Sequence, residues 1–449
     1  MRNALALILG TAETGAGQRL GQILVAHTAG NLVLNVGTMV LNFAITFALT
    51  RQLGVSGYGA YAFASAWALL LGIPATLGLA PLLVREVAAY RVTQSWGNVR
   101  GLLRRANQVV VAASLAVCGT ALLVSYVSGW PPAELHRPTL LALVLIPVTG
   151  LVSLRQAAIQ GFGRVVLARL PEAVVGPAIL LLLIAVLGPA LDDRFNASWA
   201  VGANVTAMFL AAALGVMMLR RTLPADVQRV PRQFETGRWA RLALPLVLFG
   251  AIQAVNVQLG TVLVGALGGS REAGIYSVAN RAAGLISFVL LGAMPALMPV
   301  IAGLHARRDL ARLQVLLTRS SRLVFLSSLP IALGVIVFAG PLLRIFGLEF
   351  EGGVDALRII AAGQLVNIAF GYPGTALVMT GHAAQLTGSV AAGAALNLAL
   401  SAALVPAFGA EGAAIATAIS VAGTNGLLAL VLWRRHRLFS PALALPRSR

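Results

Sequence analysis

The sequence contains no lysine, a single cysteine and only 14 acidic residues among its 449. Charged residues make up 10% of the chain, whereas soluble globular domains carry about 25%. Because Cys118 is the only thiol, no intramolecular disulfide can form. The CxxC, HExxH, GxSxG and Walker patterns are also missing, so we expect no metal and no cofactor. These absences argue against an ordinary soluble enzyme.

Hydrophobic residues are abundant instead, at 58% of the chain, with a mean hydropathy of +0.87. Each apolar segment is close to the ~20 residues that cross the hydrocarbon of a bilayer as a helix. The sequence therefore predicts an all-α integral membrane protein with about twelve transmembrane helices. The segments lie near residues 23–49, 58–79, 108–128, 139–160, 172–191, 198–219, 242–267, 275–300, 323–343, 357–379, 387–406 and 413–433.

All 33 basic residues are arginines, and they give a formal net charge of +19. They cluster in short loops between the spans, which indicates membrane topology and anionic headgroups rather than nucleic acid. With the N-terminus inside, 25 arginines lie on the cytoplasmic side and six on the outer side. We therefore expect a multi-pass protein of the cytoplasmic (inner) membrane with both termini cytoplasmic. The apolar run after Arg2 is at the lower limit of length for a signal peptide, and we interpret it as a cytoplasmic or interfacial lead-in.

The chain repeats itself at an offset near 215 residues. "LGVSGYGAYAFASAW" parallels "LGGSREAGIYSVANRA", and Gly59 and Tyr61 match Gly274 and Tyr276. Six spans in each repeat predict two pseudo-symmetric six-helix lobes of the same orientation around a central cavity. The expected parts are a cytoplasmic lead-in at 1–22, an N-lobe at 23–219, a basic linker at 220–241, a C-lobe at 242–433 and a basic cytoplasmic tail at 434–449.

The stretches "RQLGVSGYGAYAFASAWALLLGIPATLGLAPLLVREVA" and "GIYSVANRAAGLISFVLLGAMPALMPVIAGL" resemble the Wzx-type polysaccharide-export flippases. This branch belongs to the superfamily of multidrug, oligosaccharidyl-lipid and polysaccharide exporters (MOP). The resemblance covers roughly residues 20–435. It implies transport of an undecaprenyl-pyrophosphate-linked oligosaccharide to the outer leaflet by alternating access, for surface polysaccharide biosynthesis. It also implies other polysaccharide-assembly membrane proteins as partners.

The sequence departs from the family in one respect that bears on energy coupling. Many members carry an aspartate on the seventh helix before a Leu-Gly pair, but "VNVQLGTVLVGALGG" has Gln258 there. No span has an acidic residue at its centre, and Glu172 lies at the cytoplasmic mouth of the fifth. Coupling to protons or sodium ions through a carboxylate therefore lacks an obvious carrier.

Polar faces on the spans supply the candidate cavity residues. The first span carries polar residues at steps of three or four, which places them on one helical face: His27, Asn31, Asn35, Thr38 and Asn42. A water-filled cavity would satisfy them, although a packing role for His27 remains open. Gln253 and Asn256 on the seventh span and Asn280 on the eighth add to this set. On the tenth and eleventh spans glycines dominate the polar stripes, which favours helix packing.

Two arginines lie within spans. Arg281 is about six residues below the outer end of the eighth span, and it shares a face with Ser277 and Gly284. Since no acid is available at that depth, we expect it to face the cavity and bind pyrophosphate rather than snorkel to the headgroups. For Arg155, near the cytoplasmic end of the fourth span, snorkelling, pairing with Glu172 and substrate contact remain open.

Three other classes of protein compete with the flippase. A cation-coupled multidrug exporter of the same fold would normally use a membrane carboxylate. A glycan polymerase or ligase would need a large outer loop with catalytic residues, but no outer loop exceeds about a dozen residues. A scaffold would not need polar stripes on its spans. We therefore expect a transporter and not an enzyme.

Overall fold

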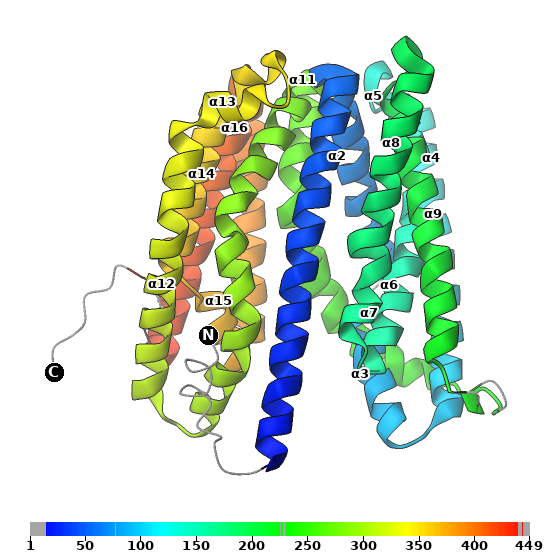
Figure 1. Ribbon diagram of the computed structural model, residues 1–449, viewed down its shortest axis with the longest axis vertical. Helices are drawn as coiled ribbons and strands as arrows, with labels where there is room; N and C mark the ends of the chain where they lie inside the picture. Colours follow the sequence, from blue (N-terminus) through cyan, green and yellow to red (C-terminus); the bar gives the residue numbers. More distant parts are fainter. Residues whose placement is uncertain (1–14, 77, 225, 228–229, 439–441, 443–449) are drawn as a thin grey trace. The chain divides into compact units, whose positions relative to one another are not determined.

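The computed structural model describes residues 15–76, 78–224, 226–227, 230–438 and 442. The side chains of residues 15–29, 31–32 and 244–257, and of several residues between 289 and 299, lie outside this description. Helices form nearly all of the described chain, and it contains no β-strand (Figure 1). The all-α fold predicted from the sequence is confirmed.

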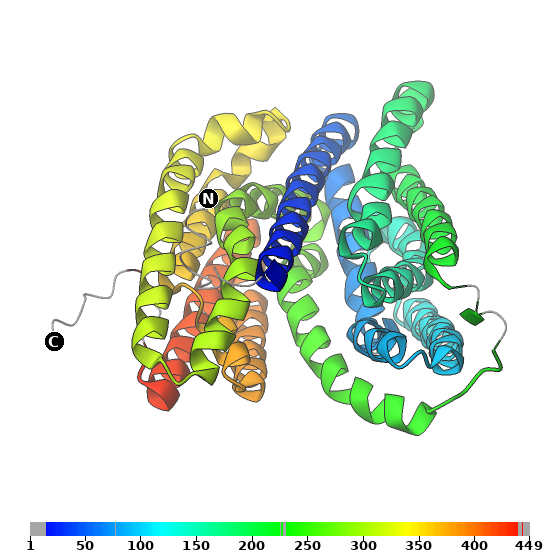
Figure 2. The ribbon, with the colours of Figure 1, turned by 60° about the horizontal axis from the view of Figure 1, so that its bottom comes forward.

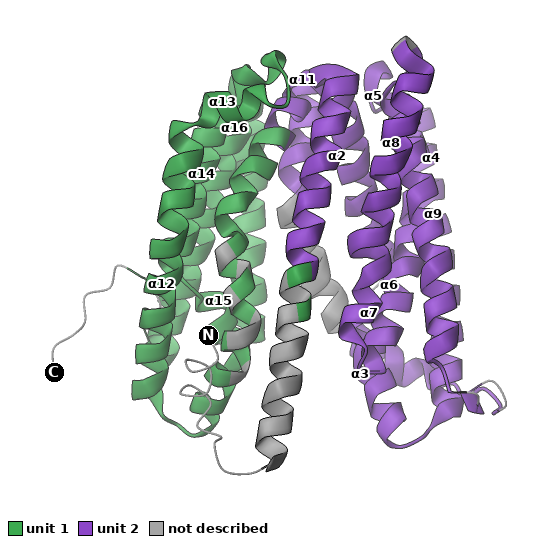
Figure 3. Cartoon of the chain, in the orientation of Figure 1, with its two compact units in different colours: residues 1–33, 278–449 green, residues 34–277 purple. Residues whose placement is uncertain are grey.

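The chain forms two compact units, residues 34–277 and residues 1–33 with 278–449 (Figure 3). The boundaries fall inside two long helices, α2 (Gly15–Thr76) and α11 (Thr236–Ala306), so each unit holds part of both. The lobes and linker expected from the repeat stay a prediction.

Within residues 34–277, α6 is the central helix and packs against α3, α4 and α9. Its residues Ile146, Ala158 and Ile159 are fully buried. The elements between α2 and α11 are α3 (Leu79–Val92), α4 (Trp96–Ser128), α5 (Ala133–Ala142), α6 (Leu145–Gly161), α7 (Val165–Leu170), the π-helical turn η1 (Pro171–Val175), α8 (Gly176–Leu191), the 3₁₀ turn η2 (Asp192–Arg194) and α9 (Ala197–Thr222).

In the other unit, α14 packs against both α12 and α16, and the three helices lie side by side in two views (Figures 1 and 2). Leu317, Leu377 and Leu432 belong to one buried cluster there. The elements after α11 are α12 (Leu310–Val337), α13 (Ala339–Arg344), the 3₁₀ turn η3 (Leu348–Gly353), α14 (Val354–Phe370), α15 (Pro373–Met379) and α16 (Ala383–His436).

Backbone torsions repeat at the sequence offset. Gly54 divides α2 with φ 65° and ψ −173°, and Gly269 divides α11 with φ 83° and ψ −177°. Only glycine adopts this region readily, because a Cβ would clash with the backbone. Five pairs of equivalent positions share a positive φ: Gly54 and Gly269, Gln94 and Arg308, Gly129 and Gly347, Gly163 and Gly381, and Asp192 and Gly409. The internal repeat therefore extends to the local geometry of the turns.

The two kinked helices cross closely just beyond their kinks. A Cβ on Gly59 would lie 2.7 Å from the Gly274 nitrogen and would also meet the Ser270 carbonyl. A Cβ on Gly274 would lie 3.3 Å from the Gly59 Cα and would meet the Val55 carbonyl. The glycines matched in the sequence repeat thus pack against each other, and their lack of side chains permits the close approach.

The outer faces of the helices are apolar. On α4, Leu115 is 65% exposed and Leu123 63% exposed, which would be unfavourable in water and suits contact with lipid. Eight helical stretches of the described chain are long and apolar enough to cross a membrane. Two of them, in α2 and α16, are divided at Gly54 and Gly409. The protein is a multi-pass membrane protein.

Candidate functional site

The polar face of the first span is partly satisfied by backbone groups. The Thr38 hydroxyl lies 2.7 Å from the Leu34 carbonyl and 2.9 Å from the Ala173 carbonyl of η1. The Asn42 amide donates to the Thr38 carbonyl at 2.8 Å. Asn35 is half-buried on the same helix. The side chains of His27 and Asn31 lie outside the described residues, as do those of Gln253 and Asn256, so their place in a cavity remains a prediction.

The carbonyl that Thr38 reaches belongs to an irregular turn in the fifth span. Pro171 begins the π-helical η1, where the missing proline N–H removes a helical hydrogen bond. Such widened turns occur often at functional sites. Glu172 is exposed in this turn and forms no ion pair with Arg155. In the sequence, Pro171, directly before the apolar segment 172–191, is the signal for this turn.

Arg155 is half-buried on α6, and its guanidinium is partly hydrogen-bonded to the backbone of its own helix. One guanidinium nitrogen donates to the Leu151 carbonyl at 2.9 Å. The Arg155 Cβ lies 3.5 Å from the position of a Cβ on Gly215 of α9. The stem therefore packs beside α9, and N–H groups remain for another acceptor.

Arg281 lies on the exposed side of α11. Its neighbours Ala282 and Ala283 are fully buried, so they form the packing face. Ser277 and Gly284, which were expected to share a face with Arg281, differ in exposure: Ser277 is buried and Gly284 is exposed. Arg281 makes no hydrogen bond or ion pair with any residue that the structure describes. The adjacent Asn280 is half-buried.

Polar residues on the tenth and eleventh spans form hydrogen bonds to neighbouring helices, which agrees with the packing role expected from their glycine-rich stripes. Ser287 of α11 donates to Gln364 of α14 at 2.7 Å, and Asn425 of α16 donates to Asn367 of α14 at 2.9 Å. Across the kink of α16, Asn397 donates to Ser420 at 2.8 Å. These amides serve packing inside their unit.

The segment between α9 and α11 is folded onto α3 and α4. The Gln233 amide donates to the Gly97 carbonyl at 3.0 Å. A Cβ on Gly97 would lie 2.8 Å from the Pro231 carbonyl, and one on Gly101 would meet the Gln233 carbonyl. Two glycines spaced four residues apart on one helix were the sequence signal for this close approach.

Glu235 fastens the same segment. It accepts hydrogen bonds from Arg238 at 2.7 Å, Asn98 at 2.8 Å and Tyr90 at 3.2 Å. The bond from Arg238 is the largest influence that holds the pKa of Glu235 below its ordinary range. Trp239 donates to the Tyr90 hydroxyl at 3.1 Å, and burial raises the pKa of Tyr90. The start of α11 is therefore fixed to α3 and α4.

Three of the five histidines meet at helix ends in the other unit. The ring centre of His436 lies 4.8 Å from that of His382 and 5.4 Å from that of His305. His436 Nε2 lies 3.3 Å from His382 Nδ1. Among the described residues no group of histidine, cysteine and acidic side chains has the geometry to hold a metal ion. No pattern in the sequence indicated this cluster, because its members are far apart in the chain.

The arrangement of helices is that of a known class of membrane transporters. Solved structures with this fold include an inward-facing multidrug resistance MATE family transporter of the MOP superfamily, with a TM-score of 0.71 and 14% identity over 89% of this chain and 94% of that chain. A MOP superfamily transporter from Pyrococcus furiosus has a TM-score of 0.63 and 13% identity over 92% of this chain and 95% of its own. At these identities the likeness concerns the fold.

Sequence comparison defines the family. The model of the polysaccharide biosynthesis proteins matches residues 24–305, and the MatE model matches residues 245–403. A protein described as "Probable flippase AglR" from Haloferax volcanii is 21% identical over 394 residues, which cover 86% of this chain and 79% of the relative. The chain belongs to the polysaccharide biosynthesis protein family and is a transporter of the MOP superfamily, as the resemblance in the sequence predicted.

Proposed function

We propose that the protein is a flippase that moves an undecaprenyl-pyrophosphate-linked oligosaccharide across the cytoplasmic membrane by alternating access. The observation that carries this proposal is the charge of the spans, which offer arginines at positions 155 and 281 and no central acid. A pyrophosphate cannot cross hydrocarbon without compensation, and guanidinium groups bind phosphate oxygens in a bidentate manner. The match to the polysaccharide biosynthesis family and the likeness to a probable flippase support the same substrate class.

The side chains assigned to the substrate pathway follow from this chemistry. Arg281 would hold the pyrophosphate near the outer end, and Arg155 would hold it nearer the cytoplasm. Six amide and imidazole groups would bind sugar hydroxyls or water along the way: His27, Asn31, Asn35, Gln253, Asn256 and Asn280. The exposed guanidinium of Arg281 is compatible with this role, since it has no partner among the described residues.

The orientation belongs to the same proposal. The arginine distribution favours twelve spans with both termini in the cytoplasm. Cysteine labelling at Arg271 and Arg447 should then place these two positions on opposite sides of the membrane. Labelling of both from one side would contradict the orientation and the number of spans.

A multidrug exporter is the second candidate, because solved structures of this fold include the MATE multidrug transporter DinF-BH, with a TM-score of 0.65 and 14% identity over 95% of this chain and 98% of its own. Exchange of a cationic drug for an ion would need a carboxylate in the pathway. None lies at the centre of a span in this sequence. A catalytic role is not part of the proposal, because the outer loops are too short to form an enzyme domain.

Deletion of the gene, followed by analysis of lipid-linked intermediates, tests the proposed class. A flippase defect should leave completed carrier-linked oligosaccharides on the inner leaflet, and a plasmid copy should restore their export. Normal export, with increased sensitivity to cationic dyes, would favour the multidrug exporter instead. Accumulation of single repeat units on the outer leaflet would indicate a polymerase.

A further inference from the structure

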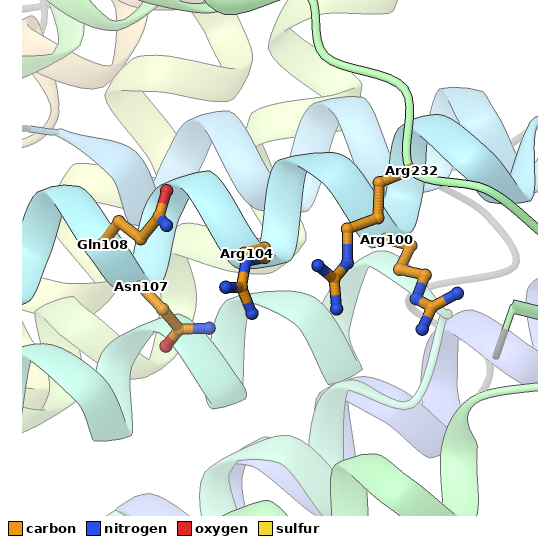
Figure 4. A pocket seen from close by; sticks show the side chains of 5 residues that line it. All are labelled: Arg100, Arg104, Asn107, Gln108 and Arg232. Carbon is orange, nitrogen blue, oxygen red and sulfur yellow. The ribbon is translucent and has the colours of Figure 1, made fainter.

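A cavity of about 380 Å³ lies near the N-terminal end of α4, and none of its lining residues is assigned to the substrate pathway. Its lining is cationic and amide-rich, with no acidic residue (Figure 4). The guanidinium groups of Arg104, Arg232 and Arg100 lie in a row along it, and Asn107 and Gln108 continue the lining along α4 (Figure 4).

Two elements build the cavity. Arg100, Arg104 and Gln108 are four residues apart on α4, so they lie on one helical face. Arg232 comes from the segment that is folded onto this helix, and Arg100 donates to the Val230 carbonyl of that segment at 2.9 Å. The backbone of the segment is thus held where it adds a third arginine to the other two.

The arginines have no described counterion. Neither Arg104 nor Arg232 forms an ion pair with any residue in the described part of the chain. The charge of Arg104 is the largest influence that lowers the pKa of Arg232, followed by burial and by Arg100. Three like charges this close repel one another, and an anion among them would relieve the repulsion. Arginine forks match the oxygens of a phosphate group.

The surroundings indicate that the anion belongs to a lipid. The apolar part of α4 begins near Gln108, one helical turn after Arg104, so the cavity lies at the level of the headgroups. Val111 and Leu115 follow on the same helical face, and they are 38% and 65% exposed. A hydrocarbon chain attached to a phosphate in the cavity would meet this apolar surface directly.

We propose that Arg100, Arg104 and Arg232 form a binding site for the phosphate ester of a membrane lipid, whose chain lies along α4. The chemistry fits an anionic phospholipid or a polyprenyl pyrophosphate, and both carry a phosphate group on an apolar chain. The choice of leaflet rests on the proposed function, because the orientation proposed there places this end of α4 on the cytoplasmic side. A site there would hold a lipid of the inner leaflet.

Native mass spectrometry and thermal unfolding of the purified protein test the site. The probes are phosphatidylglycerol, phosphatidylcholine, undecaprenyl pyrophosphate and inorganic phosphate. Phosphatidylglycerol or undecaprenyl pyrophosphate should bind and raise the unfolding temperature, and the tighter of the two identifies the source. Loss of two guanidinium groups in the double variant Arg104→Gln/Arg232→Gln should weaken that binding by about tenfold or more.

Arg105→Gln is the matched control, because Arg105 is an exposed neighbour on the same helix and does not line the cavity. It should bind the anionic lipid as the wild type does. In lipid-free detergent, Arg232→Gln should unfold at a temperature no lower than the wild type, since it removes a repulsive charge. Equal lipid binding by all variants, or stabilisation by inorganic phosphate alone, would overturn the proposal. The assay involves no transport, so its outcome is independent of the flippase proposal.

Discussion

The crossing of α2 and α11 allows a prediction whose size follows from the structure. In Gly59→Ala, the added Cβ would lie 2.7 Å from the Gly274 nitrogen, whereas ordinary contacts begin at 3.4 Å. The helices would have to separate by about 0.7 Å or more at this point, and the Ser270 carbonyl would require a larger shift. Overpacking of this kind destabilises proteins by about 1–3 kcal/mol. Gly274→Ala meets the Val55 carbonyl and should have a similar effect.

Unfolding of the detergent-solubilised protein, followed by fluorescence-detected size-exclusion chromatography, measures the effect. Each variant should unfold several degrees below the wild type, since about 2–4 °C corresponds to 1 kcal/mol in domains of 150–250 residues. Gly72→Ala on α2 is the control, because no atom lies within 4 Å of its added Cβ.

The double variant is the stricter test. Once one alanine has separated the helices, the second has less to displace, so Gly59→Ala/Gly274→Ala should lose less stability than the two single losses added together. Wild-type unfolding temperatures for both single variants would refute the close crossing. Strict additivity would show that the two positions act independently.

Three further predictions concern transport and pH. Arg281→Ala should abolish flipping at normal expression, whereas Arg281→Lys keeps the charge without the fork and should retain part of it; wild-type transport by Arg281→Ala would return this arginine to the headgroups. Asp309→Asn and Glu411→Gln should leave transport largely intact, because neither lies at the centre of a span; loss in either would reveal a carboxylate carrier. Burial, followed by the charges of its histidine neighbours, lowers the pKa of His436, which lies beyond the last apolar span, below its ordinary 6.5. Unfolded chains then bind more protons than folded ones, so the unfolding temperature should fall as pH decreases below about 6.5, and less steeply in His436→Gln; equal slopes would contradict this.

Much of the architecture could be predicted from the sequence, because an apolar segment of about 20 residues predicts a membrane-spanning helix. The internal repeat could also be recognised in the sequence, since glycine is required where the backbone bends, as at Gly54 and Gly269. The pairing of Gly59 with Gly274 in sequence even matched a contact in space. These features of the fold could be predicted because they follow from local patterns, which a single sequence contains.

The sites were harder to predict because they depend on contacts between distant segments. Arg232 lines a cavity only because Gln233 and Glu235 fasten its segment to α4. Helical periodicity placed Arg281 with Ser277 and Gly284, but the boundary between the buried and exposed sides runs through that face. Periodicity gives the angle of a residue on its helix and leaves open where neighbouring helices stop covering it.

The most direct test of the central claim uses the purified protein in liposomes that contain a fluorescent polyprenyl-pyrophosphate-linked oligosaccharide. A membrane-impermeant glycosidase outside the vesicles trims only the sugars that it can reach. Wild-type protein should render lipids of the inner leaflet accessible, so trimming should approach completion, whereas Arg281→Ala vesicles should stop near the half that began outside. Trimming of wild-type vesicles that stops at the same half, although the vesicles export a cationic dye, would contradict the account.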